Sequence, residues 1–417
     1  MSTGSARLDY VVEQVWGRSV AEGVARATVN GPVPEGWEIR EQYWAIPNAA
    51  SAQLLVPVDR TAATRTLLDY ARLRPLSTRL VRHALAGVGA TGAPLSKDTL
   101  RIVAPAGAPP TTTAELGRLV GAGSTVLATL GVRTAANAKP TLELRDRDGD
   151  AIGFVKLAWN DLTRESIENE ADALAGFGAQ SRVEISAPGV VSRGTVAGGL
   201  PYVMTEPLPR GIRHVPASYA SLSNAEALGP GKVVRRAPLE SAGQVRLVLD
   251  RLAAATPVTP APLARRATDL ARSVTQLQVS MPIANFWHGD FTWWNTGRDR
   301  AARLWLFDWE TAEADAPAGL DTLHWYAHTK DAENPASVVA RTDRALDRCA
   351  GMLRTLGHSR AGVEALAAWY AATLVANEVR LAESLQSWKR VKHSPAILED
   401  LLRWGAARID RAALLPR

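Results

Sequence analysis

One stretch in the second half of the chain constrains the fold most, because polar side chains directly follow short apolar runs there. The run Ala284–Trp287 leads into His288-Gly289-Asp290, and Asn295 comes one short loop later. A second apolar run, Leu304–Phe307, ends at Asp308. We expect the two runs to be paired strands. That pairing would bring the three polar side chains together.

Asp290, Asn295 and Asp308 are residue types that suit phosphoryl transfer. That reaction needs a carboxylate to orient and deprotonate the attacking hydroxyl, and oxygen ligands for magnesium on the phosphates. Asp and Asn oxygens are hard ligands, and Mg²⁺ takes few of them from a protein while it keeps several waters. Asp and Asn are also common turn residues. The interpretation therefore depends on the whole pattern and not on any one residue.

A lysine in the first half of the chain supports the same chemistry. Lys156 lies in an apolar strand-like run and shares a face with its hydrophobic neighbours, which is unusual unless the side chain points into a cleft. On the helix expected at about 162–177, Glu170 falls on the apolar stripe, whereas Glu168 lies off it. We expect Glu170 to pair with Lys156, with Glu168 as the second choice.

Together these residues resemble the aminoglycoside phosphotransferase and choline kinase family, which has a protein-kinase-like fold. The family pattern is His-Gly-Asp, then an Asn five residues after its Asp, then a strand that ends in Asp. The resemblance covers roughly residues 124–385. It implies that Asp290 is the catalytic base and that Asn295 and Asp308 hold magnesium.

The resemblance also assigns supporting and nucleotide-binding roles. His288 and Asp321 would brace the catalytic loop, and Lys156 with Glu170 would bind the α- and β-phosphates of ATP. The turn that contains Asn137 would cover the phosphates, although it lacks the Gly-rich loop of protein kinases. Glu206 and Leu208 would lie at a hinge beside the adenine. ATP and Mg²⁺ are the cofactors that follow from the resemblance.

The expected fold class is α+β, a two-lobed protein-kinase-like fold with an extra N-terminal α+β module. We expect that module at 1–107, a small nucleotide-binding lobe with an antiparallel sheet at 115–206, and a helical large lobe with the catalytic and acceptor site at 207–417. Within the module, one helical stretch is expected from about Ala62 to Gly87. Beyond Pro207 helices should dominate and strands should be scarce, except at Ala284–Trp287 and Arg303–Asp308.

Composition excludes several other classes. The single cysteine, Cys349, rules out an internal disulfide framework in this chain of 417 residues. No apolar run reaches the roughly 18 residues that a membrane span needs, and the N-terminal residues lack the pattern of a secretion signal. We therefore expect a cytoplasmic protein with no membrane partner. The net charge of +6 comes from scattered Lys and Arg, which favours surface solubility over nucleic-acid binding.

The predicted activity is that of a small-molecule kinase, an ATP-dependent phosphotransferase that acts on a hydroxyl. An amino sugar, another carbohydrate or an aminoglycoside-like compound is the favoured acceptor, because Trp293 and Trp294 lie between the expected base and Asn295. The alternative is a catalytically silent nucleotide-binding regulatory protein of the same fold. His324 and His328 have a spacing that could suit zinc, but structural roles are favoured for them.

Overall fold

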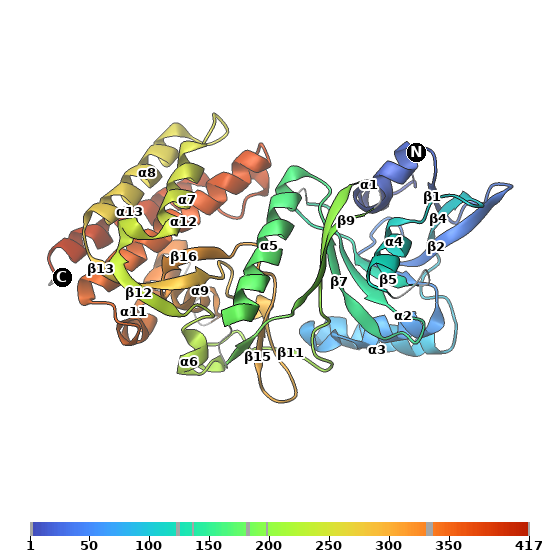
Figure 1. The fold of residues 1–417 in the computed structure, drawn as a ribbon, viewed down its shortest axis with the longest axis horizontal. Helices are drawn as coiled ribbons and strands as arrows, with labels where there is room; N and C mark the ends of the chain where they lie inside the picture. Colours follow the sequence, from blue (N-terminus) through green and yellow to red (C-terminus); the bar gives the residue numbers. More distant parts are fainter. Residues whose placement is uncertain are drawn as a thin grey trace. The chain divides into compact units, whose positions relative to one another are not determined.

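The computed structural model describes residues 3–121, 126–135, 137–180, 184–196, 199–330 and 337–415. The chain forms two compact units. The first comprises Met1–Gly178, Pro188–His214 and Asp299–Ala302, and the second comprises Ala179–Ala187, Val215–Arg298 and Arg303–Arg417. Figure 1 shows the large sheet in the first unit and most of the long helices in the second. The predicted α+β class is confirmed.

A nine-stranded antiparallel sheet forms the framework of the first unit within the described part of the chain. In spatial order its strands are β1 (Arg26–Val29), β4 (Thr99–Pro105), β2 (Trp37–Ile46), β3 (Leu54–Pro57), β5 (Leu127–Gly131), β6 (Thr141–Arg145), β7 (Ala151–Leu157), β10 (Leu200–Thr205) and β9 (Val190–Val196). Because β3 pairs with β5, the segments 1–107 and 115–206 contribute to one sheet. The predicted domain bounds stay predictions, since a shared sheet does not establish which parts fold independently.

Helices cover both faces of this sheet. They are α1 (Ala6–Ala21), α2 (Arg60–Leu68), α3 (Leu76–Ala90), α4 (Thr112–Leu119) and α5 (Asp161–Gln180), with a short 3-10 helix η1 (Ala71–Leu73). The short strand β11 (Arg213–His214) also belongs to the first unit but is not part of this sheet. Side chains alternate across a strand. As a result, Leu55 of β3 belongs to the main core with α1, while its neighbour Val56 belongs to a smaller core with α2 and α3.

The helix expected from about Ala62 to Gly87 is wrong as a single element. α2 ends at Leu68 and α3 begins at Leu76. Between them Tyr70 has a positive φ of 55°, and Pro75 directly precedes α3. A proline disfavours helical backbone in the residue before it, so the helix cannot run through this point.

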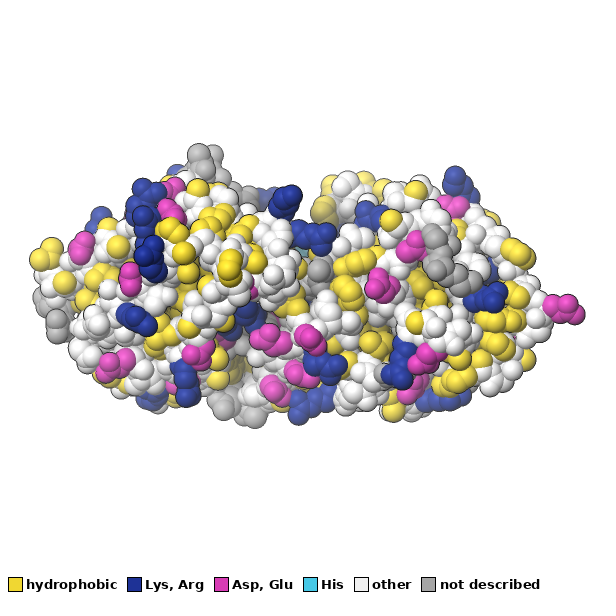
Figure 2. Space-filling view, turned by 90° about the horizontal axis from the view of Figure 1, so that it is seen from above, with side chains coloured by type: hydrophobic (Ala, Val, Ile, Leu, Met, Phe, Trp, Pro, Cys, Tyr) yellow, Lys and Arg dark blue, Asp and Glu magenta, His cyan; other side chains and the backbone are white. Residues whose placement is uncertain are grey.

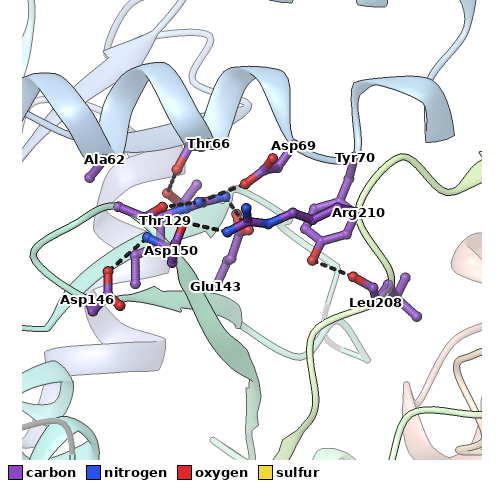
Figure 3. Close-up of polar contacts among 12 residues, drawn as sticks. Ala62, Thr66, Asp69, Tyr70, Thr129, Glu143, Asp146, Asp150, Leu208 and Arg210 are labelled. Atoms are coloured by element: carbon purple, nitrogen blue, oxygen red, sulfur yellow. Dashed lines mark hydrogen bonds and ion pairs between the residues drawn. The ribbon is translucent and has the colours of Figure 1, made fainter.

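A buried charge cluster joins α2 to the sheet of the first unit. The fully buried guanidinium of Arg145 donates to Asp69 at 2.9 Å, to the Gly149 carbonyl at 2.6 Å and to Glu143. Burial raises the pKa of Glu143 to about 7, and the charge of Arg145 opposes that rise. Figure 3 shows Asp69 and Glu143 in this cluster, beside the hydroxyl of Tyr70, which donates to the Leu208 carbonyl.

The second unit is mainly helical but also contains two small sheets. Its helices are α6 (Asn224–Ala227), α7 (Gly243–Ala253), α8 (Ala261–Gln276), α9 (Leu320–His328), α11 (Val338–Thr355), α12 (Arg360–Ser384) and α13 (Pro395–Ala413), with 3-10 helices η2 (Tyr219–Ser221), η3 (Leu239–Ser241), η4 (Trp293–Asn295) and η5 (Trp388–Arg390). Its strands are β8 (Ile185–Ser186), β12 (Val233–Pro238), β13 (Ser280–Trp287), β14 (Thr296–Arg298), β15 (Leu304–Leu306) and β16 (Glu313–Pro317).

Two expectations about these strands are wrong. Strands beyond Pro207 are more numerous than the two expected, because β12, β14 and β16 are also present, and the run that ends at Phe307 does not pair with 284–287. β13 instead lies between β12 and β16, so both of its edges are already hydrogen-bonded. β15 pairs antiparallel with β14 and parallel with β8.

Helix α12 is the centre of the second unit. It is buried on nearly all sides over its first five turns and packs against α7, α8 and α13 (Figure 1). A helix that is apolar all round has to be enclosed by other elements. Trp369 and Tyr370 of α12 are both fully buried, and Tyr370 reaches the site described below.

The surface carries both signs of charge. Figure 2 shows acidic and basic side chains interspersed on the face it presents, with hydrophobic side chains among them. Among the helices of the described residues, none is both long enough and apolar enough to cross a membrane.

The Arg145 cluster yields a stability prediction. Replacing Arg145 with Met leaves the carboxylates of Asp69 and Glu143 without their buried counter-charge. Breaking such a cluster from one side should lower the free energy of unfolding by about 3 kcal/mol. Urea denaturation followed by circular dichroism measures this change. Arg147→Met, at an exposed position of the same hairpin, should cost less than about 1 kcal/mol. Equal losses in the two variants would contradict the prediction.

Candidate active site

The loop that follows β13 has a conformation that requires glycine at one position. Gly289 has a φ of 84°, a backbone region that other residues rarely adopt. A Cβ atom there would lie 2.4 Å from the carbonyl oxygen of Thr311. The Thr311 hydroxyl also donates to the carbonyl of His288 at 3.1 Å. The backbone at 288–289 is therefore packed tightly against the segment that follows Asp308.

Asp321 holds this loop from the first turn of α9. Its Oδ2 accepts the backbone N–H of His288 at 3.0 Å, and its Oδ1 accepts that of Gly289 at 3.4 Å. The supporting contact expected for Asp321 is thus present. Burial raises the pKa of Asp321 to about 7, although the hydrogen bonds from the two backbone N–H groups favour the charged form.

His288 also braces the loop from inside the unit. Its ring is fully buried, and the Nδ1 atom accepts the backbone N–H of Asp290 at 3.2 Å. The ring packs edge to face against Trp309 at a centroid distance of 4.7 Å. Burial lowers the pKa of His288 to about 4, so the imidazole is neutral near pH 7. A neutral ring can accept the Asp290 N–H, whereas a protonated ring could not.

Asp290 presents a carboxylate that is both held in place and accessible. Asn295 donates its side-chain N–H to Asp290 Oδ2 at 2.7 Å and to the Asp290 carbonyl at 3.1 Å. The Nε2 atom of His324 lies 3.4 Å from Asp290 Oδ1. About a third of the Asp290 side chain remains exposed, at 37%. This exposure leaves room for a reacting group to approach.

The electrostatic surroundings keep Asp290 ionised. Burial acts to raise the pKa of Asp290, but the hydrogen bond and charge of His324 outweigh this effect. The result is a pKa below the ordinary value of 3.8. Asp290 is therefore a carboxylate at neutral pH, the form that can accept a proton.

Asp308 belongs to the same site. It lies two residues after the end of β15, is half-buried and has a positive φ of 70°. Its negative charge acts on the pKa values of both His288 and Asp290. The structure thus brings Asp290, Asn295 and Asp308 together, although through a sheet pairing other than the one expected from the sequence.

His324 is a residue of this site that the sequence did not indicate. Besides its contact with Asp290, its Nδ1 lies 3.0 Å from the Tyr370 hydroxyl, and its ring stacks on His328 at 4.2 Å. No group of three or more His, Cys, Asp or Glu suited to a metal was found among the described residues. His324 and His328 have the spacing of one helical turn. No local pattern in the sequence indicates that this turn faces Asp290.

The first unit contains the expected lysine–glutamate pair. Lys156 of β7 donates to both carboxylate oxygens of Glu170 on α5, at 2.7 and 2.6 Å. The Glu170 side chain is only 4% exposed, whereas Glu168 is exposed. The predicted pairing is confirmed, and Glu170 is the partner rather than Glu168. Two hydrogen bonds hold the ammonium group of Lys156 in one position.

The remaining nucleotide-binding candidates lie in loops of the first unit. Asn137 is exposed in the turn between β5 and β6. Glu206 is exposed, and its backbone N–H donates to the Gly189 carbonyl at 2.8 Å. Leu208 is half-buried, and its carbonyl accepts the Tyr70 hydroxyl at 2.9 Å. The nucleotide-binding roles of these three residues stay predictions.

Comparisons with known proteins give similarity of overall structure. No family model and no curated protein matches the sequence. The crystal structure of aminoglycoside phosphotransferase APH(4)-Ia is 12% identical with a TM-score of 0.43, and the match covers 73% of this chain and 99% of that one. Choline kinase LicA from Streptococcus pneumoniae is 12% identical with a TM-score of 0.37, covering 66% and 88%. An ethanolamine kinase from Plasmodium vivax is 10% identical with a TM-score of 0.37, covering 70% and 82%. The function proposed below rests on the side chains of the site.

The raised pKa of Asp321 predicts a pH dependence. Between about pH 4 and pH 7 the folded protein holds the Asp321 proton and the unfolded chain does not. The stability that this proton contributes is complete below pH 4 and is lost as the pH rises to about 7. Asp321→Asn cannot titrate, so the stability of the wild-type protein relative to this variant should fall across that range, by at most about 1.4 kcal/mol per pH unit. Urea denaturation at several pH values measures the difference. Parallel curves for the two proteins would contradict the prediction.

Proposed function

We propose that this protein is an ATP-dependent phosphotransferase that moves the γ-phosphoryl group onto a hydroxyl of a small molecule. The observation that carries the proposal is the arrangement around Asp290. An ionised, partly exposed carboxylate is hydrogen-bonded to the amide of Asn295 and shares its surroundings with the carboxylate of Asp308. Phosphoryl transfer requires such a base beside oxygen ligands for magnesium.

In this proposal Asp290 orients the acceptor hydroxyl and takes its proton as the phosphoryl group is transferred. Two contacts fix the direction of the carboxylate, because Asn295 holds one oxygen and His324 lies beside the other. His324 is in turn held by Tyr370 at 3.0 Å. Positioning of this kind is a large part of catalysis in phosphoryl transfer, where the protein has little covalent chemistry to perform.

Asn295 and Asp308 are the proposed magnesium ligands. Since the N–H₂ group of Asn295 donates to Asp290, the amide oxygen can serve a metal. One amide oxygen and one carboxylate suit Mg²⁺, which is bound by one or two carboxylates together with substrate phosphates and water. The ion would supply charge neutralisation on the phosphates.

Nucleotide binding is assigned to the first unit. Lys156, held by Glu170, would bind the α- and β-phosphates, and the turn at Asn137 would lie over them. Glu206 and Leu208 would meet the adenine. The backbone N–H of Leu208 makes no hydrogen bond to any residue that the structure describes, which leaves it able to donate to the base. Figure 3 shows the Tyr70 hydroxyl directed at the carbonyl of the same residue.

The proposed acceptor is a carbohydrate, an amino sugar or an aminoglycoside-like compound. Trp293 and Trp294 are the first two residues of η4, which ends at Asn295, so they lie between Asp290 and Asn295 in the chain. Both are half-buried. Aromatic faces of this kind can stack on a sugar ring. The two indoles lie edge to face at 5.5 Å, so they present differently oriented surfaces next to the proposed base.

The role of Asp290 is tested by Asp290→Asn. The amide cannot accept a proton, so kcat should fall at least about a hundredfold while the KM for ATP changes little. Steady-state kinetics with the acceptor identified by mass spectrometry measures both constants. Thermal unfolding of the variant serves as the control for folding. Near-normal turnover in a folded Asp290→Asn protein would overturn the assignment.

The role of the lysine–glutamate pair is tested separately. Lys156→Met should raise the KM for ATP or lower kcat, with kcat/KM for ATP reduced by about tenfold or more, because a positive charge at the phosphates is lost. Glu170→Gln should act in the same direction, since it frees the ammonium group to move. Glu168→Gln, at an exposed position on the same helix, is the matched control and should behave as wild type. If Lys156→Met binds and uses ATP normally, the nucleotide-binding role is wrong.

A further inference from the structure

Basic side chains surround the two tryptophans next to Asp290. The ammonium group of Lys330 lies 5.8 Å from the centre of the Trp293 ring, and that of Lys392 lies 5.9 Å from the centre of the Trp294 ring. Both lysines are exposed. A cation over an indole face is attracted to it, so these rings keep positive charge near the proposed acceptor position.

A series of ring contacts connects the two lysines and their tryptophans to the proposed base, Asp290. Trp294 packs edge to face against His328 at 5.8 Å, and His328 stacks on His324 at 4.2 Å. His324 lies 3.4 Å from Asp290. All of these residues belong to the second unit. One continuous series of ring contacts therefore connects the two lysines and their tryptophans to the proposed base.

Arg341 of α11 adds a further cation, which is partly buried. Its guanidinium makes no hydrogen bond or ion pair with any described residue, and its Nε atom is buried. α11 packs directly against α9, the helix of His324 and His328. The charge of Arg341 acts on the pKa values of His328 and Tyr370, and the charge of Asp290 also acts on Tyr370. A buried donor of this kind is normally satisfied by a partner.

Two described acidic residues near these cations are engaged elsewhere in the second unit, whereas Asp331, which directly follows Lys330, lies outside the described residues. Asp343, two residues after Arg341, accepts from Trp404 at 2.9 Å and is paired with Arg408. Glu378 is paired with His393, the neighbour of Lys392, at 2.7 Å. Among the residues that the structure describes, these pairs leave Arg341 as a cation that an anionic ligand could satisfy.

We infer that the acceptor carries an anionic group, a carboxylate, phosphate or sulfate, that Arg341 binds together with Lys330 and Lys392 while the acceptor ring packs on Trp294. This inference rests on the proposed phosphotransferase function and narrows its acceptor to an acidic carbohydrate or a similar acid. Polycationic acceptors of the aminoglycoside type are disfavoured, because the positive charges of these three basic side chains would repel them. The anionic group would lie away from Asp290, whose own charge faces the hydroxyl.

The test measures binding and transfer with one matched set of sugars. The set contains glucose, glucosamine, glucuronate, glucose 6-phosphate and glucose 6-sulfate, which differ in the charged group. Ligand-observed NMR on Asp290→Asn without nucleotide measures binding, and mass spectrometry of wild-type protein with Mg²⁺ and ATP measures transfer. We expect at least one anionic member to bind about tenfold more tightly than glucose and glucosamine. Which anion binds best tells carboxylate, phosphate and sulfate apart.

Variants connect that preference to the named residues. In the Asp290→Asn background, Arg341→Gln should weaken binding of the preferred anion about tenfold, and Arg341→Lys should restore part of it. Arg344→Gln, at an exposed position on the same helix, is the matched control and should leave binding unchanged.

The inference is overturned by any of three results. The first is that glucose or glucosamine binds as tightly as the anionic sugars. The second is that no anionic member of the set binds at millimolar concentration. The third is that Arg341→Gln binds the anion as tightly as Arg344→Gln does. Binding is measured without nucleotide, so these results leave phosphoryl transfer to other acceptors unaffected. Anion binding that depends on Arg341 but is accompanied by no transfer would instead count against the proposed function.

Discussion

The contact between Asp321 and the backbone of His288 and Gly289 is the interaction on which the rest of the site depends. A carboxylate buried in the second unit accepts two consecutive N–H groups, at 3.0 and 3.4 Å. The backbone can take this path only because Gly289 has a positive φ and no side chain against Thr311. The direction of Asp290 follows from that path. The side-chain contacts of Asp290 with Asn295 and with His324 depend on a loop that Asp321 holds from α9.

Buried charges in this molecule are divided between groups that stay ionised and groups that stay neutral. Asp290 remains ionised because the hydrogen bond and charge of His324 outweigh the effect of burial on its pKa, and His288 remains neutral because its ring is fully buried. Lys156 of the first unit is paired with a glutamate that is almost fully enclosed. Environments that move the pKa values of neighbouring groups apart are typical of sites that transfer protons. The proposed base therefore has both the protonation state and the accessibility that its role needs.

Much of the site could be predicted from local sequence patterns, and what failed was long-range pairing. The Lys156–Glu170 contact followed from one strand and one helix whose periodicities can be read directly, so its prediction is confirmed. The strand that ends before Asp308 was assigned to the wrong neighbour, because an apolar run does not specify its partner. His324 was missed for a related reason. Its contact with Asp290 depends on how α9 is placed in the second unit, which no local pattern encodes. The helix break near Tyr70 does have a local signal, because Pro75 disfavours helical backbone in the residue before it.

The most direct test of the central claim is mass spectrometry of the purified protein incubated with ATP, Mg²⁺ and a panel of sugars, sugar acids, amino sugars and amino alcohols. The account predicts that a compound of one chemical class gains one phosphoryl group, and that this gain requires Mg²⁺ and the Asp290 carboxylate. The contradicting result is that no panel member is modified and that Mg²⁺ with ATP leaves the melting temperature unchanged. A shifted melting temperature without any product would instead favour a nucleotide-binding protein that lacks transfer activity.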